Sequence, residues 1–333
     1  MTVDMQGKRV LVTGGAGFIG SHLTRRLVDL GAYVAVLTKY ESVVDNVRLA
    51  TLWDRILMIE ADLRNLDSLQ GLKELKPEIV FHLAAYNHVG GSFRNYTEAL
   101  ECNGNGTANL LNAYQDYERF VYVSSSEVYG AQTVPFIETK IPQPVSPYAI
   151  GKYTGELYCR MMMTEMGYPI SILRPFNAFG PYQSSRAVIA EIILKCLANN
   201  PVRATEGTQT REFNFVENLV DGILSGATTD NAIGEVINIG AAEEISIRNL
   251  IETIKEATES SSELQFGALP PRPTEIPRMR CDNQRAKDIL GWAPEVDFRV
   301  GLEITVDWFR TFREIYGGPD SPLNRLTPGG PVR

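Results

Sequence analysis

The sequence VTGGAGFIG, Val12–Gly20, decides the fold, because it joins a predicted strand to a predicted helix. The run KRVLVTG is short and apolar, and FIGSHLTRRLVDLG has helical periodicity up to Gly31. A backbone that passes close to a pyrophosphate needs residues without a Cβ, and a helix amino terminus supplies N–H groups and a positive dipole. In this context Gly14, Gly17 and Gly20 predict a dinucleotide-binding turn.

Strands and helices alternate after this turn. The apolar runs YVAVLT, ILMIEADL, EIVFHLAA and RFVYVSSS are separated by helical stretches near residues 66–75 and 98–117. Such alternation predicts a parallel sheet that is covered on both faces, whose buried strands are almost continuously apolar. We therefore expect an α/β fold, a Rossmann-type doubly wound parallel sheet with a smaller C-terminal α/β substrate lobe.

The pattern along the chain also predicts the domain boundaries. We expect a dinucleotide-binding Rossmann domain at residues 1–175, which also takes back part of 212–240. Residues 176–315, where short strands mix with helices, should form mainly the substrate lobe. Residues 316–333 are rich in Gly and Pro and lack periodicity, which predicts a disordered tail.

Composition excludes several classes of protein. The 333 residues are 44% hydrophobic and carry a net charge of −8, which argues against a nucleic-acid-binding surface. The four cysteines have no paired spacing and only three histidines are present, so a disulfide framework and a metal site are both unexpected. The absence of a leader pattern and of a long apolar run predicts a cytoplasmic protein without a membrane span.

The predicted second and third strands end with residues suited to the adenosine half of a cofactor. Many NAD sites place an acid after the second strand, but this strand ends with Thr38 and Lys39. A hydroxyl and a cation would tolerate a 2′-phosphate, which favours NADP slightly over NAD, unless Lys39 is simply solvated. Asp62, after the third strand, suits either a hydrogen bond to adenine or a turn.

Two stretches carry groups for proton transfer. The run SSSEVYG, residues 124–130, places three hydroxyls and a carboxylate at the end of a strand. In YAIGK, Tyr148 and Lys152 are four residues apart and share one helix face. An ammonium close to a phenol lowers the pKa of the phenol, so we expect Tyr148 to act as a base near neutral pH.

Six motifs together resemble one family. TGGAGFIG, HLAA, VSSSEVYG, SPYAIGK, RPFNAFGP and RAKDILGW occur in the order found in the extended short-chain dehydrogenase/reductase family. The resemblance runs from about residue 8 to residue 312 and is closest to the nucleotide-sugar-modifying members. It implies a tightly bound NAD or NADP, a nucleotide-diphosphate sugar as substrate, and a homodimer formed through the helices after Ser92 and Pro147. An intact Ser125–Tyr148–Lys152 set favours an enzyme over a nucleotide sensor.

The resemblance also implies roles at the end of the fifth strand. Ser125 matches the residue that binds the C4 oxygen of the sugar. Glu127 matches the base that 4,6-dehydratases use at C5, where simple 4-epimerases usually have a small residue. Ser126 stands where many dehydratases have an acid, so either Glu127 handles both protons or water assists. The 4-epimerases and the UDP-glucuronate decarboxylases, which share SEVYG, remain the alternatives.

Further contacts complete the predicted site. We expect the cofactor to contact Tyr148, Lys152 and neighbouring residues in the same motifs, namely Phe18, Ile19, Leu63, Leu83, Ala84 and Ala85. Residues matching the family positions that hold the nucleotide diphosphate or the sugar are Arg186, Arg211, Arg278, Asn177, His88 and Ser92. A guanidinium fork suits phosphate oxygens, and the case for the three arginines depends on their joint match.

Overall fold

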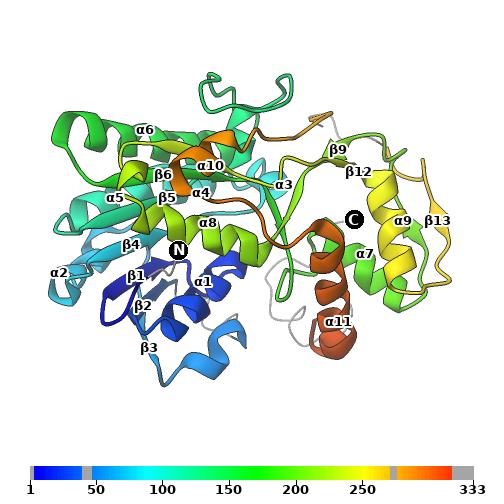
Figure 1. The fold of residues 1–333 in the computed structure, drawn as a ribbon, viewed down its shortest axis with the longest axis horizontal. Coiled ribbons are helices and arrows are strands. Elements are labelled where there is room, and N and C mark those ends of the chain that lie inside the picture. The colour runs from blue at the N-terminus through cyan, green and yellow to red at the C-terminus, as the bar shows by residue number, and fades with distance from the viewer. Residues whose placement is uncertain (1–3, 40–46, 271–275, 317–333) are drawn as a thin grey trace.

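A seven-stranded parallel sheet forms the centre of the molecule (Figure 1). The computed structural model describes residues 4–39, 47–270 and 276–316, so the predicted tail at 316–333 lies almost wholly outside the described residues. The sheet order is β11-β6-β5-β4-β1-β2-β3. Its strands are β1 (Arg9–Thr13), β2 (Tyr33–Thr38), β3 (Ile56–Glu60), β4 (Ile79–His82), β5 (Arg119–Val123), β6 (Ile170–Pro175) and β11 (Val236–Ile239). The doubly wound α/β fold expected from the sequence is confirmed.

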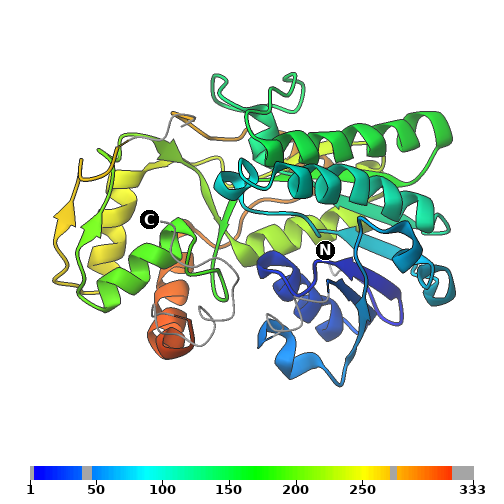
Figure 2. The same ribbon diagram turned by 180° about the vertical axis from the view of Figure 1, so that it is seen from behind.

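Helices cover both faces of the sheet, as Figures 1 and 2 show from opposite sides. One face carries α1 (Phe18–Asp29), α8 (Val216–Thr228) and α10 (Gln284–Leu290). The other carries α4 (Tyr96–Leu100), a π-helical turn η3 (Glu101–Asn105), α5 (Gly106–Ala113) and α6 (Pro147–Met166). Shorter elements between strands are η2 (Leu66–Leu69), α2 (Leu72–Leu75), α3 (Val89–Ser92), η4 (Ser126–Tyr129) and η5 (Asp230–Ala232).

The two apolar layers follow directly from the alternation of side chains along each strand. On β1, Val10 and Val12 pack in the layer under α1 and α8, whereas Leu11 packs in the layer under α5 and α6. All three side chains are at most 1% exposed. A strand buried on both faces must be apolar at every position, which is why the sequence shows continuous apolar runs.

The smaller lobe is built from the C-terminal half of the chain. Helices α7 (Val188–Leu197), α9 (Ile247–Ala257) and α11 (Phe298–Tyr316) pack around their own apolar core. Three two-stranded pairs join them: β7 (Asn177–Phe179) with β10 (Phe213–Phe215), β9 (Thr210–Arg211) with β12 (Ile245–Ser246), and β8 (Val202–Arg203) with β13 (Leu264–Gln265). The chain nevertheless returns to the large domain, because β11 joins the main sheet and Trp292 packs in its core.

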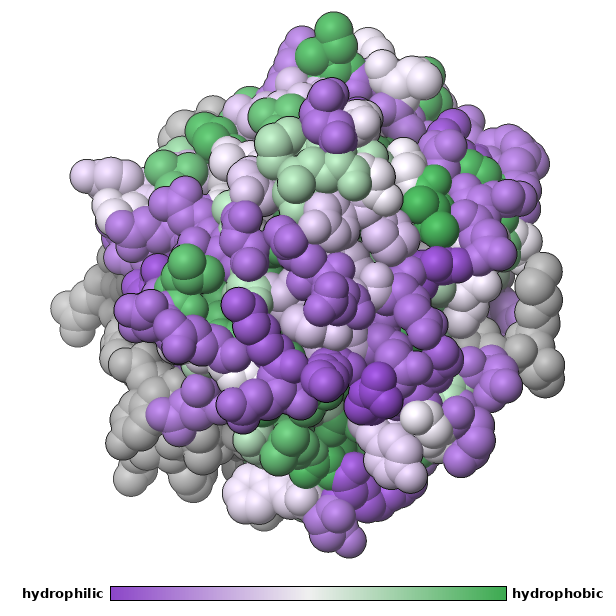
Figure 3. Space-filling view, turned by 90° about the vertical axis from the view of Figure 1, so that its left-hand side faces the viewer, coloured by the Kyte–Doolittle hydropathy of each residue, from purple (hydrophilic) through white to green (hydrophobic). Residues whose placement is uncertain are grey.

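The amino-terminal edge of the main sheet is a largely hydrophilic face (Figure 3). A hollow of about 620 Å³ lies there, lined by Arg9, Lys73, Lys76, Glu78, Asn112, Ala113, Tyr114, Gln115, Asp116 and Glu118. Charges of both signs pair around it, as in the ion pairs of Lys8 with Glu78 and Glu118. The glycine-rich turn and the proton-transfer residues are at the opposite edge, so this hollow is not the candidate site.

Two further properties concern the chain as a whole. None of the helices in the described ranges combines the length and the apolar character that a bilayer crossing requires. The four cysteines all lie within those ranges, and each is a buried free thiol.

Candidate active site

A cavity of about 300 Å³ opens at the carboxyl ends of β1, β4, β5 and β6. Open α/β sheets bind their ligands at this edge. Thirteen of the residues predicted from the sequence line it, namely Gly14, Gly17, Phe18, Ile19, Gly20, Leu83, Ala85, Ser125, Ser126, Glu127, Tyr148, Lys152 and Asn177. The remaining lining residues are Asn87, Val89, Val123, Ser124, Pro175, Phe176 and Ala178. The glycine-rich turn and the predicted proton-transfer residues therefore line the same cavity.

The glycine-rich turn forms the floor beside the first helix. Gly14 has a φ of +71°, and a Cβ added there would lie 2.7 Å from the backbone nitrogen of Ala84. At Gly20 an added Cβ would lie 2.1 Å from the carbonyl oxygen of Gly14. Gly17 is the N-cap of α1, and among the described residues no side chain caps this helix end. Its first-turn N–H groups are thus left for a ligand, and the turn fits a pyrophosphate.

Helix α6 brings Tyr148 and Lys152 to the cavity. It begins with Pro147, and the Ser146 hydroxyl accepts a hydrogen bond of 3.2 Å from the Ala149 N–H, which satisfies a first-turn donor. Lys152 is buried and its Nζ donates to the carbonyl oxygen of Val123 at 2.6 Å. The ammonium also lies 4.8 Å from the ring centroid of Tyr122.

Burial sets the protonation of this pair. Burial raises the pKa of Tyr148 to about 12; a hydrogen bond with Ser125 opposes this rise and the charge of Glu127 adds to it. Burial lowers the pKa of Lys152 to about 8. We expected Lys152 to lower the pKa of the phenol, and in this chain that expectation is wrong. The physical reason is that the ammonium is directed to the Val123 carbonyl, so that burial, and not Lys152, dominates the pKa of the phenol.

The turn after β5 orients the three residues of the SSE sequence differently. Ser125 is the N-cap of η4, and its Oγ accepts a hydrogen bond of 3.2 Å from the Glu127 N–H. Ser126 is buried and its hydroxyl is 3.7 Å from the sulfur of Met279. Glu127 is only partly buried and lines the cavity with Tyr148. Both residues line the cavity, but the Ser126 hydroxyl is directed to Met279.

A buried ion pair behind the cavity was not predicted from the sequence. Arg174 donates to Glu156 through Nε at 2.9 Å and through Nη2 at 2.6 Å, and both side chains are 0% exposed. The Ser124 hydroxyl donates to the same carboxylate at 2.5 Å. Glu156 is four residues after Lys152 on α6, which is the one signal that could have found it.

Asn103, in the π-helical turn η3, was also missed. Its amide nitrogen donates to the carbonyl oxygens of Tyr86, at 3.2 Å, and of Tyr148, at 3.5 Å. Its carbonyl oxygen accepts from the Tyr86 N–H at 2.7 Å. Asn103 therefore links the loop after β4 to the start of α6. A π turn is rare and often functional, but it has no sequence signature.

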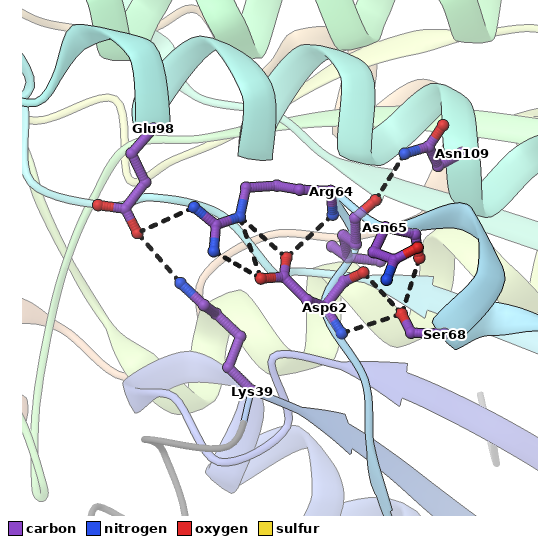
Figure 4. A network of polar contacts seen from close by, with 8 residues as sticks. Lys39, Asp62, Arg64, Asn65, Ser68, Glu98 and Asn109 are labelled. Atoms are coloured by element: carbon purple, nitrogen blue, oxygen red, sulfur yellow. Dashed lines mark hydrogen bonds and ion pairs between the residues drawn. The ribbon is translucent and has the colours of Figure 1, made fainter.

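The residues predicted for the adenosine half of the cofactor lie apart from the cavity, around the ends of β2 and β3 (Figure 4). Thr38 is buried, and Lys39 forms an ion pair with Glu98. Asp62 accepts four hydrogen bonds from Arg64, one from the backbone N–H and three from the guanidinium, which holds the pKa of that carboxyl below its usual range.

Two more residues predicted to contact the cofactor, Leu63 and Ala84, each form a backbone hydrogen bond. Leu63 is buried and its carbonyl oxygen accepts a hydrogen bond from Asn109 at 2.8 Å. Ala84 donates its N–H to the hydroxyl oxygen of Thr13 at 3.2 Å. Neither residue is among those that line the cavity.

The structure does not bring His88 and Ser92 to the cavity. His88 caps the short helix α3, where its Nδ1 accepts from the Gly91 N–H at 2.6 Å. Ser92 is 0% exposed and donates its hydroxyl to the Val89 carbonyl at 2.6 Å. Asn87 and Val89 line the cavity instead. His88 and Ser92 each form a hydrogen bond within their own short helical turn, and the sequence did not indicate these local contacts.

The three arginines also lie outside the cavity lining. Arg211, on β9, and Arg278 are brought to one strip of the smaller lobe by the hydrogen bond from the Thr210 N–H to the Pro277 carbonyl, 3.0 Å long. Arg278 is exposed and forms an ion pair with Glu244. Arg186 is exposed and precedes α7.

Comparison with known proteins agrees with this geometry. The family model described as GDP-mannose 4,6 dehydratase matches residues 11–305. The chain belongs to the extended short-chain dehydrogenase/reductase family, in its NAD-dependent epimerase/dehydratase group. It is an enzyme of this group, which modifies nucleotide sugars.

Its relatives catalyse more than one reaction. The chain is 34% identical over 311 residues to a UDP-glucose 4-epimerase of Mycolicibacterium smegmatis, covering 91% of this chain and 98% of that one. It is 34% identical over 323 residues to a dTDP-D-glucose 4,6-dehydratase of Bos taurus, covering 92% and 90%. A solved UDP-glucuronic acid 4-epimerase from Bacillus cereus, in complex with UDP-glucuronic acid and NAD, is 31% identical with a TM-score of 0.84, covering 91% and 99%.

Proposed function

We propose that this protein is a nucleotide-sugar 4,6-dehydratase. The observation that carries the proposal is the carboxylate of Glu127, which lines the same cavity as Tyr148 and Lys152. A 4-epimerase requires proton transfer only at the C4 hydroxyl. A dehydratase also requires a base that removes the C5 proton once C4 is a ketone, and a carboxylate in this position provides one.

The residues then divide the reaction between them. Ser125 binds the C4 oxygen and Tyr148 takes the proton of the C4 hydroxyl, for which its phenol must first be ionised. Glu127 takes the C5 proton, and the C6 hydroxyl leaves as water with a proton from Glu127 or from water. When hydride returns to C6, C5 takes up a proton from solvent. When bound, NAD supplies the hydride acceptor for C4, the hydride donor for C6, and a positive charge that favours the phenolate. Because the cycle is redox-neutral, the cofactor stays bound.

We propose NAD rather than NADP as this cofactor. The sequence favoured NADP slightly because β2 ends with Thr38 and Lys39. Lys39, however, forms an ion pair of 3.0 Å with Glu98, which offsets its charge. A cytoplasmic location, also expected from the sequence, stays a prediction.

A 4-epimerase is the second candidate, and one observation favours it. A dehydratase needs an acid for the departing C6 hydroxyl. The hydroxyl of Ser126, at the matching position, is buried and directed to the sulfur of Met279. In a dehydratase Glu127 or water must therefore supply that proton.

One experiment separates the candidates. The protein is incubated with a panel of nucleotide sugars in heavy water, and products are examined by mass spectrometry and NMR. We expect loss of water and deuterium at C5. Glu127→Gln should stall after C4 oxidation, accumulating reduced nicotinamide absorbance, with turnover about 10²–10⁴-fold lower. Tyr148→Phe should stall before C4 oxidation, without an increase in reduced nicotinamide absorbance.

The control is Glu118→Gln, an exposed carboxylate beside the opposite end of β5, which should keep full turnover. A product without C5 deuterium and of unchanged mass, together with an active Glu127→Gln variant, would establish the epimerase instead. Release of CO₂ from a uronic acid substrate would establish a decarboxylase.

We also propose that the protein is a homodimer formed through α4 and α6. These helices lie side by side on one face of the molecule (Figure 2). Several of their apolar side chains, and one just before α4, are exposed by 38–58%, namely Phe93, Tyr96, Leu100, Ile150, Leu157 and Met161. Exposed apolar side chains that gather on two adjacent helices are typical of a protein interface.

A further inference from the structure

Four charged side chains form one network where β2 and β3 end (Figure 4). Glu98, from α4, accepts a hydrogen bond from Lys39 Nζ at 3.0 Å and lies 4.0 Å from Nη1 of Arg64. Arg64 in turn holds Asp62 with contacts of 3.0 and 2.6 Å. A single carboxylate, that of Glu98, thus bridges two cations from two different strand ends.

The position of the network relates it to the 2′ group of a dinucleotide. The glycine-rich turn follows β1, and β2 and β3 are the next strands on that side of the sheet. In such folds the adenosine ribose lies at the end of the second strand. An acid there binds a 2′-hydroxyl, and a cation there binds a 2′-phosphate. Here β2 ends with Thr38 and Lys39, so the acidic group closest to Lys39 among the described contacts comes from α4.

The charges of the network decide which cofactor fits. Lys39 and Arg64 are balanced by Asp62 and Glu98, so the four groups have a net charge of zero. A 2′-phosphate would bring about two negative charges and would need at least one of the cations. If Lys39 turned to the phosphate, Glu98 would lose its 3.0 Å contact, keep only the 4.0 Å contact with Arg64, and lie beside the phosphate as a like charge. A 2′-hydroxyl is uncharged, so it neither draws Lys39 away from Glu98 nor is repelled by the Glu98 carboxylate.

The side chains are accessible to a ligand without being fully exposed. Their exposed fractions are 39% for Lys39, 38% for Glu98, 35% for Arg64 and 32% for Asp62. Solvent therefore screens their interactions, and the preference that one carboxylate sets should be a matter of several-fold rather than of many orders of magnitude.

We propose that Glu98 determines cofactor specificity, holding Lys39 and Arg64 so that the site takes the 2′-hydroxyl of NAD and disfavours the 2′-phosphate of NADP. This role rests on the proposed function only in requiring that a nicotinamide dinucleotide binds at the glycine-rich turn. It concerns the adenosine half of the cofactor and is independent of the choice between dehydratase and epimerase.

A competition experiment tests the role of Glu98. The full-length protein is incubated with an excess of an equimolar mixture of NAD and NADP until the bound amounts stop changing. Unbound dinucleotide is removed, the protein is denatured, and both released dinucleotides are quantified by chromatography. Wild type should release mainly NAD. Glu98→Gln should raise the ratio of NADP to NAD roughly fivefold, and the gain should shrink at high salt because it is electrostatic.

Two further variants make the result specific. Glu101→Gln removes an exposed carboxylate three residues further along the same helical segment and should leave the ratio at its wild-type value. Adding Lys39→Met to Glu98→Gln should reduce the gain, because Lys39 is one of the two cations that Glu98 contacts.

The outcomes separate this role from the proposed function. Dinucleotide release with a ratio that Glu98→Gln leaves unchanged, or a wild type that releases mainly NADP, overturns the role of Glu98 alone. If no variant releases either dinucleotide, the proposed function fails and the role of Glu98 fails with it.

Discussion

Lys152 carries a charge in a place where water is largely excluded. Its side chain is 3% exposed, and burial lowers its pKa to about 8. An unfolded lysine has a pKa of about 10.4. Between these values the unfolded chain binds the proton and the folded chain does not. At neutral pH the buried charge lowers the free energy of unfolding. This free energy therefore increases as the pH rises through this window and the folded protein loses the charge.

This linkage gives a prediction for Lys152→Met. Below about pH 8 both states of wild type are protonated, so the difference in unfolding free energy between wild type and variant is constant. From about pH 8 to 10.5 wild type should gain on the variant by up to about 3 kcal/mol. Urea unfolding of both proteins at pH 7 and pH 10 measures the change.

The control for this titration is Lys73→Met, at an exposed lysine. Its difference from wild type should vary by less than about 0.5 kcal/mol over the same range. If the Lys152→Met difference were equally flat, the ammonium would not be desolvated in the folded protein.

At the scale of elements, α6 is fixed by a buried ion pair as well as by apolar contacts. Glu156 joins this helix to β6 through Arg174 and to the end of β5 through Ser124. A buried pair adds little net stability, but removing one partner leaves the other charge uncompensated. The Arg174 guanidinium also lies 4.7 Å from the ring centroid of Tyr129, which limits how far it can relax.

We therefore predict that Glu156→Gln lowers the free energy of unfolding by about 3–5 kcal/mol. The double variant Glu156→Met with Arg174→Met should recover much of this loss, because no isolated charge remains. Denaturant unfolding measures both. Glu165→Gln, exposed on the same helix, is the matched control and should change stability by less than about 0.5 kcal/mol. A double variant less stable than Glu156→Gln alone would contradict this account.

Local signals explain which elements the sequence predicts well. The glycine spacing at Gly14, Gly17 and Gly20 and the four-residue spacing of Tyr148 and Lys152 each describe one turn or one helix face. Geometry within such a unit depends on near neighbours. Both units line the cavity, because the glycine-rich turn follows β1 and α6 carries Tyr148 and Lys152 to the same edge of the sheet.

Contacts between distant segments could not be predicted in the same way. Lys39 and Glu98 are 59 residues apart, and their pairing depends on how α4 packs over the strand ends. Arg278 meets Glu244 only because segments of the smaller lobe lie side by side. The π turn at Glu101–Asn105 interrupts a stretch that reads as one continuous helix. Helical periodicity carries no information about such an interruption.

At the scale of the whole molecule, α6 has two sides with different roles. Tyr148, Lys152 and Glu156 repeat every four residues and face the cavity and the core. Ile150, Leu157 and Met161 occupy other positions of the same helix and are exposed by 39–49%. A helix whose outward side is also apolar is expected to bury that outward side against another protein surface.

The last prediction concerns this exposed surface. Light scattering should give wild type a mass of twice 37.0 kDa, the mass of one chain. Ile150→Glu with Leu157→Glu should give single chains, because two buried carboxylates on each copy would face an apolar partner without compensation. Ile304→Glu, which alters an exposed apolar residue on α11 in the smaller lobe, should remain a dimer. A wild type that stays at 37.0 kDa at micromolar concentration, or an Ile150→Glu, Leu157→Glu variant that stays dimeric, would show that copies do not pair through this face.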